Sequence, residues 1–109
     1  MKNILVVFEN KQHIESNIQK FVEMLSSGEV VSVQKCNNII TTNDIITGNK
    51  IVYKLIGCGF PYCYDLGGKL YGWKFDDVMI HADVVLTKKV DEYLKSRMNP
   101  VKEFIEFEV

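Results

Sequence analysis

Five consecutive apolar residues near the amino terminus, Ile4-Leu5-Val6-Val7-Phe8, restrict the folds open to this chain more than any other feature. A run of this length is typical of a β-strand, and a strand without polar alternation is buried on both of its faces. Such strands lie in the middle of sheets that carry helices on both sides. The sequence therefore predicts an α/β fold with this segment as its central strand.

Two amphipathic helices are also predicted. Apolar residues recur with helical spacing from Ile14 to Leu25 and again from Leu86 to Met98, with polar residues between them. Asn10 is the expected N-cap of the first helix because its side chain can accept a hydrogen bond from the first turn. Thr87 or Asp83 is the expected N-cap of the second.

The remaining strands are predicted from short β-rich runs at 30–33, 39–42, 45–46, 51–56, 78–80 and 104–109. Gly48-Asn49 lies between apolar runs, which favours a hairpin between residues 45 and 56. In the tail, Ile105, Phe107 and Val109 share one face, as in an antiparallel or edge strand. We expect one domain over residues 1–109, with a mixed sheet of five or six strands, two main helices and a long loop rich in glycine and aromatic residues.

The charge balance argues against a nucleic-acid-binding surface. The 109 residues include 13 Lys plus Arg and 14 Asp plus Glu, a formal net charge of −1, whereas duplex binding neutralises several phosphates. The amino-terminal apolar run is too short for a secretory signal, and no run approaches the roughly 20 residues that span a bilayer. We therefore expect a cytoplasmic protein, and its odd number of cysteines indicates reduced thiols.

The loop expected between Gly57 and Trp73 is the strongest candidate contact surface. Aromatic side chains supply a large contact area at small entropic cost and are enriched at binding hot spots. The residues assigned to partner binding are Phe60, Tyr62, Tyr64, Lys69, Tyr71, Trp73 and Lys74. The alternative is that most of the aromatic residues cover the open end of the sheet. Stacking on single-stranded nucleic acid would also need a basic groove, and two lysines do not make one.

The segment from Leu70 to Pro100 resembles the Walker B region of phage large terminase subunits and related RecA-like ATPases. In that family a Gly-containing loop precedes an apolar strand ending in Asp-Glu, and the helix that follows closes with a YLxSR pattern. The matching residues are Leu70-Tyr71-Gly72, Val78-Met79-Ile80 and Tyr93-Leu94-Lys95-Ser96-Arg97. The resemblance implies that the strand at 4–8 and the strand at 51–56 belong to the part between Walker A and Walker B.

The residues that would make such a chain an ATPase are missing. A phosphate cradle needs G-x-x-x-x-G-K-[ST], but Cys63 stands where a glycine should precede Gly68, and Leu70 replaces the hydroxyl residue. His81 and Ala82 fill the Asp-Glu positions, and alanine neither polarises a water nor holds a metal. We therefore expect a protein with no catalytic residues and no cofactor, a remnant adapted to another task.

The sequence allows three further kinds of chemical site, each with a purely structural alternative. Zinc could be held by Cys58, Cys63 and His81 with Cys36 or His13 as a fourth ligand, but the C-x4-C pair has no second pair, and buried thiols are the alternative. The thiolate of Cys58 or Cys63 beside His81 would be a nucleophile, whereas a histidine that closes a strand usually hydrogen-bonds locally. Magnesium could be held by Asp65, Asp76, Asp77 and Asp83, or these acids could be solvated or cap helices.

Two functions from different classes follow. The first is a non-catalytic accessory protein of a phage or mobile element that binds a protein partner in a bacterial host. Its specific form would be an inhibitor of a host defence or nucleic-acid-processing enzyme such as a CRISPR nuclease, with the carboxy-terminal strand as a candidate homodimer edge. The second is a nucleotide- or nucleic-acid-binding module, in which Glu9, Asn10, His81 and Asp83 line a crevice at the carboxyl ends of the strands. A third alternative is a cysteine-dependent enzyme.

Overall fold

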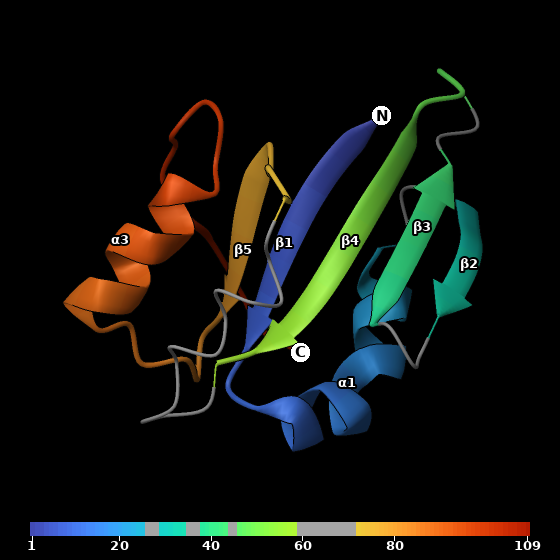
Figure 1. Cartoon of the computed structure of the whole chain (residues 1–109). Helices are drawn as coiled ribbons and strands as arrows, with labels where there is room; N and C mark the ends of the chain where they lie inside the picture. The colour runs from blue at the N-terminus through green and yellow to red at the C-terminus, as the bar shows by residue number, and fades with distance from the viewer. Residues whose placement is uncertain (26–28, 35–37, 44–45, 59–71) are drawn as a thin grey trace.

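In the part of the chain that the structure describes, the protein forms a six-stranded mixed sheet with one helix against each face (Figure 1). The computed structural model describes residues 1–25, 29–34, 38–43, 46–58 and 72–109. The strands are β1 (Lys2–Phe8), β2 (Glu29–Gln34), β3 (Ile39–Asn43), β4 (Lys50–Gly57), β5 (Asp77–His81) and β6 (Ile105–Phe107). The helices of these residues are α1 (Lys11–Met24) and α3 (Lys88–Ser96). The predicted α/β class is therefore confirmed.

Strand β1 lies inside the sheet, in the order β2-β3-β4-β1-β5-β6. It pairs in parallel with β4 on one side and with β5 on the other, and β6 continues the parallel set beyond β5. Strands β2 and β3 extend the sheet by antiparallel pairing next to β4. The five residues from Ile4 to Phe8 are all buried, so the prediction of a strand covered on both faces is confirmed.

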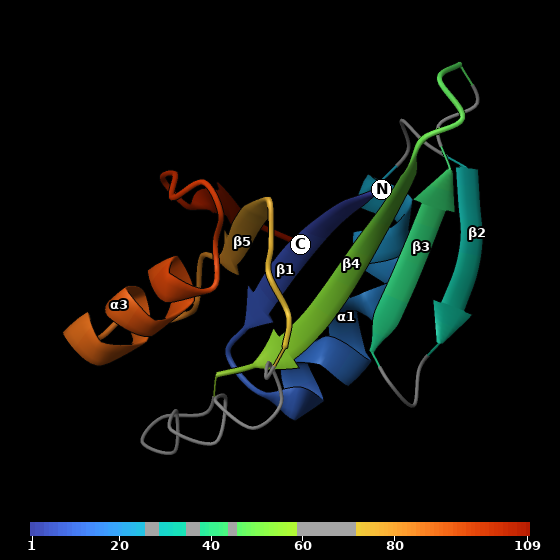
Figure 2. The same cartoon turned by 45° about the horizontal axis from the view of Figure 1, so that its top comes forward.

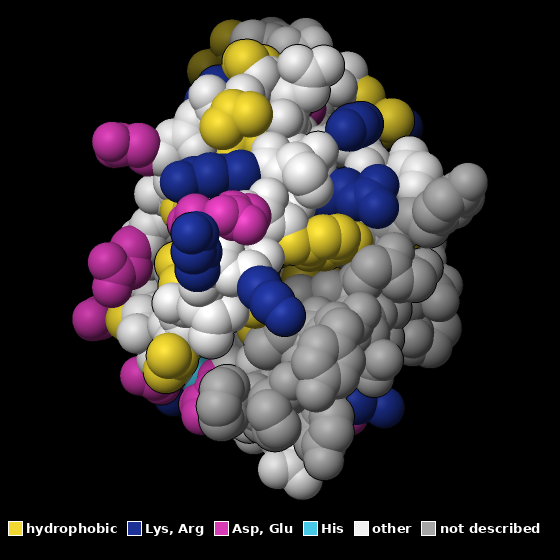
Figure 3. Space-filling model, turned by 60° about the vertical axis from the view of Figure 1, so that its left-hand side comes forward, with side chains coloured by type: hydrophobic (Ala, Val, Ile, Leu, Met, Phe, Trp, Pro, Cys, Tyr) yellow, Lys and Arg dark blue, Asp and Glu magenta, His cyan; other side chains and the backbone are white. Residues whose placement is uncertain are grey.

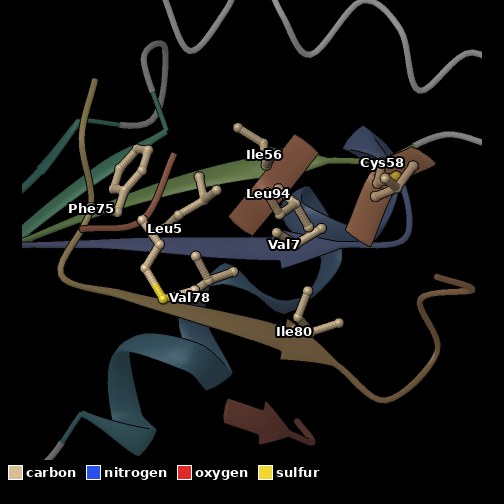
Figure 4. Close-up of a cluster of buried hydrophobic side chains, with 10 residues drawn as sticks. Leu5, Val7, Ile56, Cys58, Phe75, Val78, Ile80 and Leu94 are labelled. Carbon is tan, nitrogen blue, oxygen red and sulfur yellow. The ribbon is translucent and has the colours of Figure 1, made fainter. Parts of the chain in front are cut away.

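Alternate side chains of β1 contribute to two separate hydrophobic cores. Leu5 and Val7 pack on the face that carries α3, together with Val90 and Leu94 of that helix. Figure 4 shows this cluster, in which Leu94 points from the helix toward Val7 of the central strand. On the other face, Ile4, Val6 and Phe8 pack with Ile14 and Phe21 of α1. The period of two along the strand thus distributes one apolar run between two layers.

Both helices begin at side-chain caps. The Asn10 side chain accepts a hydrogen bond from the backbone N–H of His13 at 2.8 Å, and Thr87 accepts one from that of Val90 at 3.3 Å. Each bond satisfies an amide that the first helical turn leaves without an intrahelical partner. The prediction for Asn10 is confirmed, and Thr87 rather than Asp83 caps the second helix.

One predicted pairing was wrong. The hairpin that reaches β4 uses Ile39–Asn43 as its other strand, whereas Ile46 lies in a turn and is 94% exposed. An isoleucine pair has high β-propensity, but here the β3 run has a buried face, with Ile40 fully buried, whereas Ile46 is exposed. The tail strand β6 is an edge strand, one of the two arrangements predicted for it, and it pairs in parallel with β5 because the chain crosses over through α3.

Candidate ligand site at the carboxyl end of the sheet

The chain leaves β1 and β5 toward opposite faces of the sheet. After β1 it enters α1, which packs on one face, and after β5 it leads to α3, which packs on the other. Figure 2 shows α1 behind β4 and β3, and α3 beside β5. Adjacent parallel strands whose connections diverge in this way form a topological switch point, where α/β proteins usually bind their ligands.

The four residues predicted for a crevice all lie at this end of the sheet. Glu9 follows β1 and is exposed, and Asn10 is half-buried and uses its side chain to cap α1. His81 is the last residue of β5 and is only 4% exposed. Asp83 follows two residues later, and the exposed fraction of its side chain is 64%. The structure thus places a buried imidazole and two exposed carboxylates around the switch point.

His13 is the residue that the crevice prediction omitted. It lies in the first turn of α1, and its ring centroid is 4.4 Å from that of His81, with the two rings nearly perpendicular at 78°. The sequence offered one signal for His13. Asn10 was expected to cap the helix directly after the central strand, so a residue three positions later must lie near the carboxyl end of that strand. That His81 would be its neighbour depends on the pairing of β1 with β5.

Both imidazoles are packed among aromatic rings. Phe8 lies 5.7 Å from His81 in a stacked arrangement and 5.6 Å from His13 edge to face. Phe107 contacts the His81 ring from the neighbouring strand β6, at a centroid distance of 5.4 Å. The apolar walls reduce the solvation of the imidazole nitrogens, so each of these nitrogens needs a partner inside the protein or a bound ligand.

Two of the imidazole nitrogens have no such partner. The backbone N–H of Asp83 donates to Nδ1 of His81 at 3.0 Å, which leaves Nε2 as the protonated nitrogen of the neutral ring. Nε2 of His81 and Nδ1 of His13 are buried and have no hydrogen-bond partner among the described residues. An unsatisfied buried polar group costs about 1–3 kcal/mol. These two atoms belong to rings that lie in contact, so pairing them with one ligand would recover part of this cost.

Of the residues assigned to partner binding, Phe60, Tyr62, Tyr64, Lys69 and Tyr71 lie outside the described residues. Trp73 is half-buried, stacks on Phe75 at 5.4 Å and packs against the core under α3. Lys74 is exposed, and its Nζ donates to the carbonyl oxygen of Ser96 at 3.0 Å. Lysine and arginine side chains gather on this side of the molecule (Figure 3). Trp73 therefore contributes to the core, whereas Lys74 remains available at the surface.

The structure does not bring Cys58 and His81 together, as the zinc arrangement and the Cys58 form of the nucleophile arrangement would require. Cys58 is buried in the core on the α3 face, among residues such as Ile56 (Figure 4), whereas His81 packs with Phe8 and Phe107 on the α1 face. The sheet therefore separates the thiol from the imidazole. The other two cysteines, Cys36 and Cys63, lie outside the described residues.

The acidic set proposed for magnesium is divided between the two ends of the sheet. The Asp76 carboxylate accepts a hydrogen bond from the backbone N–H of Asn3 at 2.8 Å. Asp77 forms ion pairs with Lys2 at 2.8 Å and with Lys102 at 3.2 Å. The hydrogen bond from Lys2 lowers the pKa of Asp77 below its usual value, against the opposing effect of partial burial. Both aspartates precede or begin β5, whereas Asp83 follows its other end, and Asp65 lies outside the described residues.

Comparisons with protein families, with curated proteins and with solved structures found no match to this chain. The resemblance to phage terminases therefore remains a prediction. Among the described residues, neither helix is long and apolar enough to cross a membrane.

Proposed function

We propose that this chain works by binding rather than by catalysis, and that it binds a small ligand of the nucleotide class at the carboxyl end of β1 and β5. The observation that carries the proposal is the switch point, because α1 and α3 leave these neighbouring strands toward opposite faces. Open α/β sheets bind nucleotides at this position more often than at any other.

The chemistry around the switch point suits a phosphorylated ligand with sugar hydroxyls. The amino terminus of α1 carries the positive end of the helix dipole, and its first turn contains Lys11 and His13 and no acidic residue. Glu9 and Asp83 are exposed carboxylates beside it, and a carboxylate at this end of an α/β sheet commonly accepts hydrogen bonds from ribose. The absence of a P-loop motif from the sequence argues against hydrolysis of a triphosphate.

A thermal-shift series with AMP, ADP, ATP and GTP tests this function, with one arm in EDTA and one in magnesium. A ligand at a hundredfold excess over its dissociation constant stabilises the fold by about 2.7 kcal/mol, which raises the melting temperature of a domain of this size by about 10 °C. We expect Glu9→Ala and Asp83→Ala to reduce that shift, and Glu92→Ala, an exposed acid on α3, to leave it unchanged. No shift with any of the four nucleotides in either arm contradicts the proposal.

A second candidate function, docking onto a protein partner, is favoured by the surface around α3. Val85 is 72% exposed, Val101 63% and Leu86 40%, and Figure 3 shows several basic side chains, with acidic ones among them, on the side of the molecule that carries α3. Apolar residues next to positive charge would suit an acidic protein partner, in keeping with the accessory or inhibitory function expected from the sequence. Phage origin and a CRISPR nuclease as target remain predictions.

Lys74→Glu is the sharper substitution for the docking function, because Trp73→Ala would also remove a side chain that packs in the core. In a pull-down from bacterial lysate, we expect Lys74→Glu to abolish capture of a partner. Lys20→Glu, on the exposed side of α1, should leave that capture intact. Equal capture by both variants would contradict an interface at Lys74.

A further inference from the structure

The two histidines at the switch point and Asp83 have potential metal-ligand atoms close to one another. One ligand atom from each of His13, His81 and Asp83 lies within 4.8 Å of the other two. Ligands of a tetrahedral zinc ion at about 2.0–2.1 Å lie roughly 3.3 Å apart, so small side-chain rotations bring these three groups to coordination distance. The residues come from α1, the end of β5 and the turn after it, and the parallel pairing of β1 with β5 brings them together.

The unpaired nitrogens of His13 and His81 could act as ligands of a metal ion. Nδ1 of His13 and Nε2 of His81 are buried without a hydrogen-bond partner among the described residues, and His81 is more than nine-tenths buried. The two perpendicular rings do not form a hydrogen bond with each other in this arrangement. A metal ion can take up the lone pair of His13 Nδ1 and, once the ring proton of His81 has moved from Nε2 to Nδ1, the lone pair of His81 Nε2 as well.

Asp83 supplies a negative charge for the metal ion, and its exposed position gives the ion a path from solvent. Its carboxylate oxygen Oδ2 lies 3.8 Å from Nδ1 of His81, and its side chain is largely exposed while the His81 ring is enclosed. A carboxylate beside a histidine ligand either completes the coordination or orients the imidazole, and in both cases it raises metal affinity. The exposed side of Asp83 leaves room for water to fill the remaining coordination position.

We propose that His13, His81 and Asp83 form a binding site for a divalent transition-metal ion, of which zinc is the best match. Imidazole nitrogens and a carboxylate suit zinc, cobalt and nickel, whereas magnesium and calcium prefer oxygen ligands alone. Coordination through Nε2 of His81 requires the ring proton to move to Nδ1, which then no longer accepts the hydrogen bond from the backbone N–H of Asp83. The Nδ1–H can instead donate to the Asp83 carboxylate after a side-chain rotation that shortens the present 3.8 Å separation. This site differs from the cysteine-containing zinc arrangement considered from the sequence, and it does not depend on nucleotide binding.

Isothermal titration of the full chain with zinc chloride, without nucleotide, tests the proposal. We expect one ion per chain and a loss of at least tenfold in affinity for Asp83→Ala, in line with the effect of removing a carboxylate from a histidine–metal site. His81→Phe, whose ring fits the aromatic surroundings, should abolish binding. Glu92→Ala is the matched control and should bind as the wild type does.

Two further measurements keep the result unambiguous. Urea unfolding in EDTA shows whether each variant is folded, and because Asp83 is exposed its alanine variant should unfold at the wild-type midpoint. Cobalt substitution identifies the donors, since nitrogen and oxygen ligands give visible bands without the intense charge-transfer band of a thiolate. Stoichiometric zinc binding unaffected by Asp83→Ala and His81→Phe, a thiolate band, or no zinc binding by the wild type would each overturn the assignment.

Discussion

Gly57 determines how closely β4 approaches the start of α1, and replacing it by alanine tests the geometry of the whole carboxyl end. A Cβ atom at this position would lie 2.6 Å from both the carbonyl carbon of Asn10 and the backbone nitrogen of Lys11, and 2.9 Å from the Cα of Asn10. All three are backbone atoms at the beginning of a capped helix. They cannot rotate aside as the end of a flexible side chain could, so either β4 or the first turn of α1 must shift.

We expect Gly57→Ala to lower the free energy of unfolding by about 2–3 kcal/mol, the upper part of the range for overpacked positions. For a domain of this size the melting temperature should fall by about 10 °C. Urea denaturation followed by circular dichroism measures the first quantity, and a thermal scan measures the second. The shift of α1 also moves His13 relative to His81, so zinc affinity should fall with stability.

Gly48 provides the matched control, because there the backbone conformation, and not a close approach of other atoms, favours glycine. Its backbone is left-handed, with φ +72°, and a Cβ atom there would meet nothing within 4 Å. Gly48→Ala should therefore cost only about 1 kcal/mol, and Gly48→Asn less, since asparagine tolerates this conformation. At Gly57 asparagine should be no better than alanine. A Gly57→Ala variant as stable as the wild type would refute the close approach of β4 to α1.

Two other substitutions test the remaining parts of the fold. The pKa of Asp77 is lowered in the folded state, so its ion pairs stabilise the fold above the unfolded pKa of about 3.9 and cease to do so as the pH falls through the folded value. Asp77→Asn should thus cost up to about 1 kcal/mol at pH 7. The gap between its urea midpoint and that of the wild type should close as the pH falls from about 3.9 through the folded pKa of Asp77; a gap that stays constant over this acidic range would exclude the ion pairs as its cause. Thr87→Ala should cost about 1 kcal/mol by uncapping α3, and Thr87→Ser should restore most of it; if serine were as unstable as alanine, the hydroxyl would not be acting as the cap.

Local sequence signals predicted the parts of the fold that depend on near neighbours. The unbroken run from Ile4 to Phe8 predicted a strand buried on both faces, and Asn10 was identified as a cap from its position before an amphipathic segment. For the second helix the same signal left Thr87 and Asp83 as alternatives, of which Thr87 is the cap. The hairpin to β4 was placed wrongly because Ile45-Ile46 has the composition of a strand. Which run pairs with β4 depends on burial against α1, which a local pattern does not contain.

The site was predicted only in part for the same reason. The rule that ligands bind at strand carboxyl ends identified His81 and Asp83, but the contact of His81 with His13 requires β5 to pair directly with β1, and the strand order was not predicted. The pairing of Cys58 with His81 failed because the two residues point to opposite faces of neighbouring parts of one sheet. The alternation of residues along one strand shows which of them point the same way. Which residues of different strands lie on the same face of the sheet becomes clear only from the assembled structure.

A map of amide chemical shifts during zinc titration of the isotopically labelled chain tests most directly whether the binding site lies at the carboxyl ends of β1 and β5. The largest changes should fall on residues 8–13 and 81–84 and on Phe107, with little change in β2, β3 or the far end of α3. Changes centred on Cys58 or on the exposed residues around α3, or a spectrum that zinc does not alter, would contradict the account.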